Sequence, residues 1–342
     1  MRLFTCLLIA GAVILGGCTG GKDASGESPS NTGPVASGDN KPSTGTFKVA
    51  LLTPGPVSDA GWSAMAYDGL QQIKTHMSAE VNNQEATGTK IKDSMRSYAQ
   101  QGYNLIFGHG YEYNAPALEI AKDFPKTVFV SSSGGGTATN VGAFRFYLEQ
   151  GFYLAGMIAA QMSKTGKLAM VGDLSIPSIV STFKGFKAGA MAVNPNIQVI
   201  QVSSGNGTDV AKAKQATLSV ISEGADFVIH QANAAAQGVF DACKEKGVYA
   251  FGANSDQNSN ASGAVIASAV IVAGPAFENL AKQVKDGTFK GSIVLMGMQE
   301  GAIDLVVNPG MASKIPAEVL KKIDQAKADI KSGKLTVPKD EF

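Results

Sequence analysis

Short apolar runs alternate with longer amphipathic stretches from residue 47 onward, and this alternation constrains the fold more than any other feature. The apolar runs predict strands buried on both faces, at residues 47–53, 103–110, 127–133, 140–146, 167–173, 197–204, 225–232, 248–254 and 291–299. The intervening stretches predict helices at 61–77, 115–125, 149–166, 179–195, 209–224, 236–247, 275–286 and 317–331. Buried strands separated by helices are typical of parallel sheets with crossover helices, so the sequence predicts an α/β fold.

The chain length and the net charge limit the number of lobes and the kinds of partner that we expect. Residues 47–342 are too many for one small core and fit two lobes of ordinary size. The chain has 29 Lys and Arg against 28 Asp and Glu, a formal charge of +1. This near-neutral balance gives no indication of a nucleic-acid partner.

The N-terminus predicts an exported protein. The segment MRLFTCLLIAGAVILGGC has one positive charge, an apolar stretch too short to span a membrane, and small residues before Cys18. We expect residues 1–17 to be a signal peptide; the small residues resemble a bacterial lipobox, which implies acylation of Cys18 and attachment to a membrane. An ordinary signal peptide cut elsewhere and an uncleaved anchor are the alternatives. Residues 18–46, rich in Gly, Ser, Pro and Asn, predict a flexible tether.

The sequence has no recognisable catalytic, cofactor or metal motif. His76, His109 and His230 are its three histidines, and they lack the spacing of metal ligands. No nucleophile elbow or phosphate loop occurs, and Asp59 with Asp256 is the only carboxylate pair that we can propose for acid–base chemistry. The sequence therefore predicts a binding protein with no cofactor or metal, and not an enzyme.

Polar residues and glycines follow nearly every predicted strand. They occur at 53–55, 108–110, 131–136, 205–207, 231–233 and 254–256. Turn chemistry accounts for some of them, but the carboxyl ends of parallel strands are also where ligands bind in open α/β sheets. We therefore expect a ligand site at these ends.

Trp62 is the only tryptophan, and it lies just after the first predicted strand, where a helix should begin. Such a residue is either part of the core or a ligand contact. Tyr111 and Tyr113 follow another strand, and Phe183 lies near the start of a helix in the second half, where it could face them. Aromatic rings at these positions favour stacking on a flat ligand, and nearby amides and carboxylates would orient it.

Four stretches of the sequence resemble the basic membrane protein family of ABC-transporter substrate-binding lipoproteins, which includes purine nucleoside receptors. They are SDAGWSAMAYDGL, the segment from GYNLIFGHGYEY to FPKTVFV, NVGAFRFYLEQGFYLAGMIAAQMSKTGKLAMVG, and FKGFKAGAMAVNP with the later GADFVIHQANAAAQGVFDACKEKGVYAFGANSDQ. The resemblance covers residues 47–310, and the central block and the G-F-x-A-G…N-P element are its most specific parts.

The resemblance implies a type I periplasmic-binding-protein fold, in which two doubly wound parallel-sheet lobes are joined by a three-strand hinge and close on a ligand. Residues 47–146 with 257–290 would form the first lobe, and 147–256 with 291–342 the second. The three crossovers would fall near 145–148, 254–257 and 290–293.

The resemblance also implies roles for particular residues. Trp62 would stack on a base, Asp59 would orient the polar edges of the ligand, and Asn114 lies where relatives often have an aspartate that bonds base nitrogens. Asp256 belongs to the segment that corresponds to G-V-D-x-D-Q in the family. Closure of the lobes would bring three amides, those of Asn206, Asn233 and Asn254, against the ligand.

The sequence departs from the family pattern at three places. Asn254 replaces the carboxylate that grips ribose hydroxyls in relatives. The lysine that relatives often have after the following S-V element would fall near Ile271, so that contact is lost. Residues 205–209 read GNGTD and lack the family's aromatic residue. An amide donates as well as accepts hydrogen bonds, so these departures weaken the nucleoside assignment but not the general class.

The predicted function is therefore that of a lipid-anchored solute receptor in the cell envelope, on a periplasmic or extracellular face. It would bind a purine nucleoside or a related small aromatic or polar solute and deliver it to ABC permease and ATPase subunits. The alternative is a solute sensor or surface-binding lipoprotein of the same fold without a role in transport.

Overall fold

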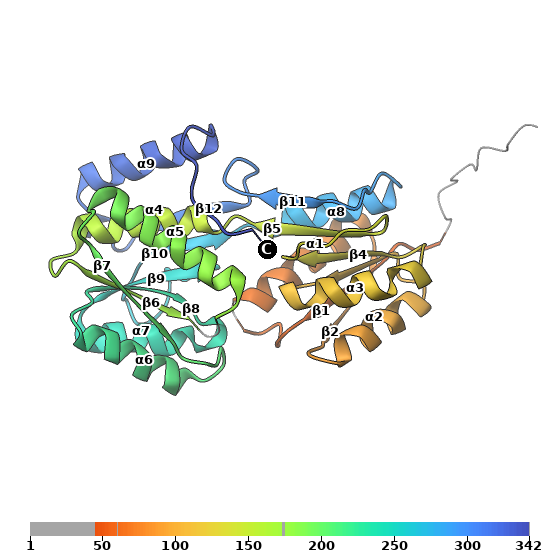
Figure 1. The fold of residues 1–342 in the computed structure, drawn as a ribbon, viewed down its shortest axis with the longest axis horizontal. Coiled ribbons are helices and arrows are strands. Elements are labelled where there is room, and N and C mark those ends of the chain that lie inside the picture. The colour runs from red at the N-terminus through yellow and green to blue at the C-terminus, as the bar shows by residue number, and fades with distance from the viewer. Residues whose placement is uncertain (1–44, 60, 173–174, 342) are drawn as a thin grey trace, which may run out of the picture. The chain divides into compact units, whose positions relative to one another are not determined.

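The computed structural model describes residues 45–59, 61–172 and 175–341. The predicted signal peptide, Cys18 and nearly all of the predicted tether lie outside the described residues. Two six-stranded sheets organise the described chain, and Figure 1 shows each of them between layers of helices.

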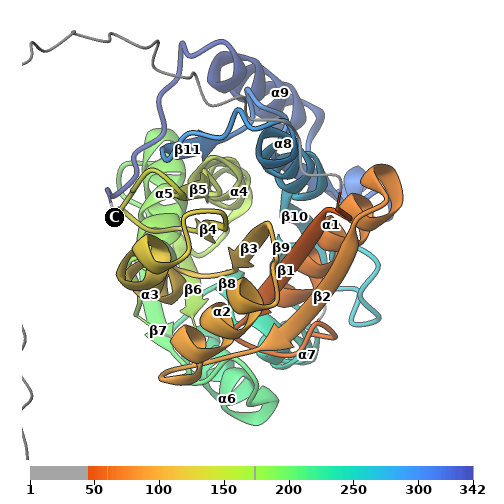
Figure 2. The same cartoon turned by 90° about the vertical axis from the view of Figure 1, so that its right-hand side faces the viewer.

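The first sheet is parallel throughout. Its strand order is β11-β5-β4-β3-β1-β2. The strands are β1 (Lys48–Thr53), β2 (Glu80–Glu85), β3 (Leu105–Gly108), β4 (Val128–Ser132), β5 (Val141–Phe146) and β11 (Ile293–Met296). The helices α1 (Trp62–Met77) and α8 (Gly274–Lys285) cover one face, and α2 (Lys90–Gln100) and α3 (Asn114–Ile120) cover the other (Figure 2).

Alternation along β1 explains why both faces of this sheet are covered. Val49 and Leu51 pack in the cluster that includes Leu70 of α1, whereas Ala50 and Leu52 pack in the cluster that includes Ile91 of α2. Successive side chains of a strand point to opposite faces, so a fully apolar strand needs a helical layer on each side.

The second sheet has the order β12-β10-β9-β8-β6-β7, and only β12 runs antiparallel to its neighbour. Its strands are β6 (Lys167–Gly172), β7 (Gln198–Ser203), β8 (Phe227–Gln231), β9 (Tyr249–Asn254), β10 (Val265–Ile271) and β12 (Ile303–Val307). Helices α4 (Glu149–Met162), α5 (Pro177–Val193) and α9 (Ala317–Lys331) lie on one face, and α6 (Val210–Ser222) and α7 (Ala236–Lys246) on the other. Short 3₁₀ turns are formed by Tyr111–Tyr113, Ala121–Asp123, Asn233–Ala235 and Ala312–Lys314.

Three connections join the two sheets, and only the first lies where the sequence placed it. The first links β5 to α4 at residues 147–148. The second was expected near 254–257 but follows β10, at 272–273, and the third was expected near 290–293 but joins β11 to β12 across 297–302. The expected division of the chain is therefore wrong for β10, which pairs with the second sheet, and for β11, which pairs with the first.

The physical reason lies in segments whose periodicity is uninformative. β10 is the continuous apolar run VIASAVI, which does not distinguish a buried strand from a buried helix, and it was not predicted as a strand. The edge strand β2, EVNNQE, is mostly polar and was also missed, together with α2 and β12.

No helix within the described ranges is long and apolar enough to cross a membrane.

Candidate functional site

A cavity of about 170 Å³ lies where the carboxyl ends of the two sheets meet. Residues at or just after the ends of β1, β3, β4 and β5 of the first sheet and β8, β9 and β10 of the second line it, together with the first turns of α1, α4 and α5. This is the position at which open α/β sheets bind ligands, as expected from the polar residues that follow the strands.

Four of the residues singled out from the sequence as possible ligand contacts line this cavity. They are Trp62 and Tyr111 from the first lobe, and Asn233 and Asn254 from the second. Tyr111 is 46% exposed, so its ring lies at the cavity mouth rather than in a core. An apolar side chain, Ile271 at the end of β10, also lines the cavity, at the point where the resemblance led us to look for a lysine.

Trp62 is held rigidly at the cavity wall by His109. The indole Nε1–H donates to the carbonyl oxygen of His109 at 3.0 Å, and the imidazole Nε2–H donates to the carbonyl oxygen of Trp62 at 2.9 Å. The two rings stack with centroids 3.9 Å apart and an interplanar angle of 20°. Because the imidazole covers one face of the indole, a ligand can stack only on the other face. The wall is therefore preorganised, which reduces the entropy lost on binding.

His109 is neutral in this arrangement. Its Nδ1 accepts a hydrogen bond from the Ser132 hydroxyl at 2.8 Å, and its Nε2–H donates to the Trp62 carbonyl oxygen. In a neutral imidazole one ring nitrogen donates and the other accepts, so both contacts fit the tautomer that is protonated on Nε2. Burial lowers the pKa of His109 to about 3. His230, in the second lobe, is also buried, and burial lowers its pKa to about 4.

Acid should destabilise the fold through these buried imidazoles. As the pH falls below about 6.5, the unfolded chain binds protons that the folded imidazoles do not, so the free energy of unfolding falls. For His109 this loss is about 2 kcal/mol between pH 7.5 and pH 5. We expect the substitution His109→Asn to remove that part of the pH dependence, measured by urea unfolding at several pH values. An equally steep pH dependence in the variant would contradict the prediction.

Asp59, Asn206 and Asp256 lie outside the cavity lining, because their side chains satisfy nearby backbone groups. The Asp59 carboxylate accepts from the N–H groups of residues 61, 63 and 64 at 2.9 Å each, at the start of α1. Asn206 Oδ1 accepts from the N–H of Thr208 at 2.8 Å, and the exposed Asp256 accepts from the N–H of Asn258 at 2.9 Å. Capping and turn formation use the same residue types as ligand binding, so the sequence did not separate the two roles.

Asn114 and Phe183 are buried within their own lobes and do not line the cavity. Asn114 Nδ2 donates to Ser131 Oγ and to the Gly136 carbonyl oxygen at 3.0 Å each, and its Oδ1 accepts from the Gly136 N–H at 2.9 Å. It therefore fixes the glycine-rich loop after β4. The Phe183 ring is 2% exposed and packs 6.3 Å from that of Phe152, so it does not face Trp62 across the cavity.

Backbone conformation also marks the cavity. Among the described residues other than glycine, four have positive φ, and three of them line it: Ser133 at 70°, Asn233 at 45° and Asn254 at 68°. Left-handed conformations at residues with a Cβ are sparsely populated and cluster at binding sites. Asn254 is 3% exposed, and its Nδ2 donates to Gln231 Oε1 at 3.4 Å, so its amide is held at the cavity wall.

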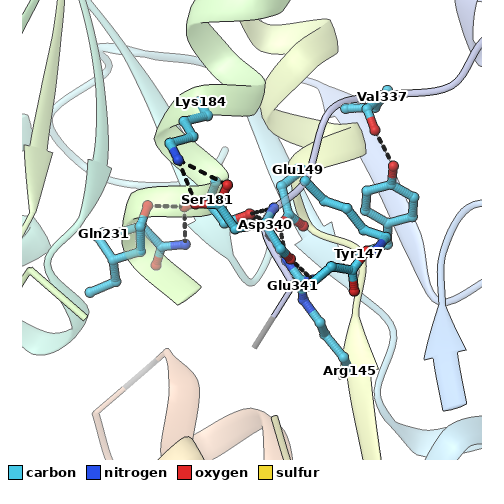
Figure 3. A network of polar contacts seen from close by, with 12 residues as sticks. Arg145, Tyr147, Glu149, Ser181, Lys184, Gln231, Val337, Asp340 and Glu341 are labelled. Atoms are coloured by element: carbon cyan, nitrogen blue, oxygen red, sulfur yellow. Dashed lines mark hydrogen bonds and ion pairs between the residues drawn. The ribbon is translucent and has the colours of Figure 1, made fainter. Parts of the chain in front are cut away.

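A buried ionic network that we did not predict from the sequence contributes to the cavity wall. Arg145, at the end of β5, pairs with Glu149, the first residue of α4, and both line the cavity. The guanidinium also donates to Ser181 Oγ of α5 at 3.1 Å. Ser181 in turn donates to Glu149 Oε1 and accepts from the Asp340 N–H at 2.8 Å (Figure 3). Burial raises the pKa of Glu149, and the charge of Arg145 opposes this effect.

The segment after α9 returns to this network. Arg145 donates to the carbonyl oxygen of Asp340, and Lys184 donates to both carboxylate oxygens of Asp340 at 2.7 and 2.8 Å. The Tyr147 hydroxyl donates to the carbonyl oxygen of Val337 (Figure 3). This segment therefore fastens the first connection between the sheets to α5. In the described chain no group of His, Cys, Asp and Glu side chains is arranged to hold a metal ion.

The chain is similar to the proteins of one known family. The model of a family described as ABC transporter substrate-binding protein PnrA-like matches residues 46–341. A purine-binding protein of Brucella abortus (strain 2308) is 30% identical over 293 residues, which is 84% of this chain and 82% of that protein. The ABC transporter nucleoside-binding protein BmpA of Lactococcus lactis subsp. cremoris is 29% identical over 363 residues, 98% of this chain and 97% of that protein.

Solved structures share the fold. A solute-binding protein of an ABC transporter system from Aeropyrum pernix K1 has a TM-score of 0.77 at 19% identity, and the match covers 86% of this chain and 94% of that one. A transcriptional activator of the comK gene from Bacillus halodurans has a TM-score of 0.72 at 26% identity, and the match covers 85% of this chain and 99% of that one.

Proposed function

Because the chain belongs to the family of PnrA-like ABC transporter substrate-binding proteins, we propose that it captures a purine nucleoside, or a related small aromatic and polar solute, between its two lobes. The bound solute is then delivered to an ABC permease and its ATPase. The family consists of binding proteins of the type I periplasmic fold and not of enzymes, which confirms the family, the fold and the non-enzymatic role expected from the sequence.

The observation that carries the proposal is the indole of Trp62 at the cavity. The ring lines the cavity, is locked by two reciprocal hydrogen bonds to His109, and has one face covered by the imidazole, so a flat ligand would stack on the other face. Amides from the other lobe, Asn233 and Asn254, lie on the same cavity. A flat heterocycle with polar edges matches this combination of one aromatic platform and facing amides.

The relatives support the nucleoside assignment, since one is described as purine-binding and another as nucleoside-binding. In a two-sided arrangement, aromatic rings from both lobes would enclose the base. Phe183, the aromatic residue expected from the second lobe, is buried instead. We therefore propose that the base stacks on a single aromatic face, and that the amides of the second lobe secure its edges and the attached sugar. Only contacts made preferentially in the closed state would shift the lobes toward closure.

Trp62 provides a direct test, because it is the only tryptophan of the chain. Titration of residues 47–342 with purine nucleosides, free bases and other small solutes should change the intrinsic fluorescence for one class of solute. Replacing Trp62 by Ala should weaken binding by about 1–3 kcal/mol, roughly 5- to 150-fold, if stacking here resembles base stacking elsewhere. Because the variant lacks the fluorophore, its affinity is measured by calorimetry.

The matched control is Trp62→Phe, which keeps an aromatic face but removes the Nε1–H donor to His109. It should retain more affinity than the alanine variant. Equal affinity of the alanine variant and the unmodified protein would exclude Trp62 from the site. Binding of a non-aromatic solute class alone would contradict the nucleoside assignment.

Anchoring to a membrane through acylated Cys18 is also part of the proposal, as is a location on a periplasmic or extracellular face. The motif before Cys18 supports it, and the position lies outside the described residues. An anchored tether would keep the receptor close to its permease.

A sensor without a transport role is the second candidate. The Bacillus halodurans structure with the same fold is described as a transcriptional activator, which supports this alternative. Reconstituted permease and ATPase distinguish the two. Stimulation of ATP hydrolysis by the solute-loaded protein supports import, whereas solute binding without stimulation favours sensing.

A further inference from the structure

One carboxylate oxygen of Glu149, a residue that lines the cavity, has no hydrogen-bond partner among the described residues. Glu149 is 1% exposed, and its Oε1 accepts hydrogen bonds from Arg145 and Ser181. Its Oε2 makes none, and it is the only buried side-chain nitrogen or oxygen without a hydrogen bond in the described part of the chain. Buried polar atoms are nearly always hydrogen-bonded, so this exception requires an explanation.

Contacts within the protein use only one of the two carboxylate oxygens of Glu149. Arg145 and Ser181 are both engaged with the same oxygen, Oε1, and Arg145 also donates to the Asp340 carbonyl oxygen. Helix α5, which carries Ser181, also packs closely against the start of α4, since a Cβ added at Gly185 would lie 2.8 Å from the Glu149 carbonyl oxygen. The protein therefore fixes the orientation of the carboxylate and leaves Oε2 unpaired in a residue that lines the cavity.

We propose that Glu149 determines the specificity of the cavity, because its Oε2 accepts a hydrogen bond from an O–H or N–H group of the bound solute. This inference rests on the proposed solute-binding function and deepens it. The solute would be an uncharged or cationic molecule that presents a donor at its inner end, such as a sugar hydroxyl or an amino group. A solute that presents only acceptors there would leave Oε2 buried and unpaired, which disfavours its binding.

The pairing of Glu149 with Arg145 makes this assignment chemically consistent. The guanidinium balances the carboxylate charge, so a neutral solute can bind without leaving a net charge buried. A hydrogen bond to a charged acceptor is stronger than one between neutral groups. A solute that lacks the donor forfeits this bond and therefore binds more weakly than one that has it.

The experiment combines one substitution with a series of solutes. Nucleosides, free bases, pentoses and small amines are first screened for binding to the unmodified protein. For each solute that binds, analogues that lack one donor at a time are measured by calorimetry. One donor should account for a loss of about 10-fold or more in affinity. In Glu149→Gln the parent solute should bind more weakly by a similar factor, and the discrimination between it and that analogue should disappear.

The matched control is Ser181→Ala, which removes a partner of Oε1 and leaves Oε2 unchanged. It should keep the discrimination between the parent solute and the analogue. The analogue series on the unmodified protein tests the inference even if Glu149→Gln does not fold, since an absence of any donor-dependent loss would overturn it.

The failure of this inference is distinguishable from that of the proposed function. If nucleosides bind and Glu149→Gln binds every analogue as the unmodified protein does, Glu149 has no role in specificity and the proposed function stands. If only a non-nucleoside solute binds and its affinity depends on one donor through Glu149, the nucleoside assignment fails and the role of Glu149 is supported.

Discussion

Replacing Arg145 by methionine is expected to lower the free energy of unfolding by about 3–5 kcal/mol, since removing one partner of a buried ion pair leaves the other charge uncompensated. Arg145 is 6% exposed and Glu149 is 1% exposed, so the solvent cannot replace the lost partner. Urea unfolding at pH 7, followed by circular dichroism and Trp62 fluorescence, measures the loss. Because burial already raises the pKa of Glu149, the folded variant should regain stability as the pH falls and the carboxyl group becomes protonated.

Two further variants separate the buried charge from general damage. The double substitution Arg145→Met and Glu149→Gln should recover much of the lost stability, because it removes the unpaired charge. Lys184→Met breaks the ion pair between Lys184 and Asp340, in which the lysine side chain is 57% exposed and the aspartate side chain 35% exposed. This substitution should lower the free energy of unfolding by no more than about 1 kcal/mol. A loss in Arg145→Met as small as that in Lys184→Met would show that the buried pair contributes little.

The sequence indicated the location of the cavity because the rule for parallel sheets is geometric. Strands that are apolar on both faces require helices on both sides, and this leaves the carboxyl ends of the strands as the place where polar groups gather. Trp62, Tyr111 and Asn233 follow three different strands and Asn254 ends a fourth, and the structure brings them to one cavity. Their roles as ligand contacts remain predictions.

Local chemistry limited how precisely the site residues could be chosen. Asp59 and Asn206 occur in the same kind of position as Asn233, after a strand, but their oxygens accept hydrogen bonds from N–H groups within five residues of the chain. Whether a short polar side chain bonds its own backbone or points into a cavity depends on local φ and ψ angles, which composition does not fix. The positive φ angles of Asn233 and Asn254 became visible only in the structure.

A signal for the missed ionic network is present in the sequence. Between residues 141 and 162, only Arg145 and Glu149 are charged, and they are four residues apart. Charged residues in an otherwise apolar stretch are seldom buried unless they are paired. This spacing could therefore have predicted a buried ion pair, whereas its approach to Ser181 and Asp340 depends on tertiary structure.

The most specific motifs of the chain, YLAG in α4 and GFKAG in α5, correspond to helix packing rather than to ligand contacts. A Cβ added at Gly189 would lie 1.9 Å from the carbonyl oxygen of Tyr153, and one added at Gly156 would lie 2.1 Å from that of Phe186. The two helices therefore touch through their backbones. This contact places α5 against Glu149 and sets the position of the second lobe's cavity wall.

Replacing Gly189 by alanine should accordingly destabilise the chain by about 3 kcal/mol or more, since the methyl group would force apart two backbones that cannot shift like a side chain. Helix propensity alone predicts the opposite sign, a gain of up to about 1 kcal/mol. Gly69→Ala in α1 is the matched control: its new Cβ would meet the Phe277 side chain, the nearest atom being 3.0 Å away. A ring can move by a few tenths of an ångström, so this loss should be smaller. Urea unfolding of both variants gives the order, and an equal or smaller loss for Gly189→Ala would mean that the α4–α5 contact relaxes without cost.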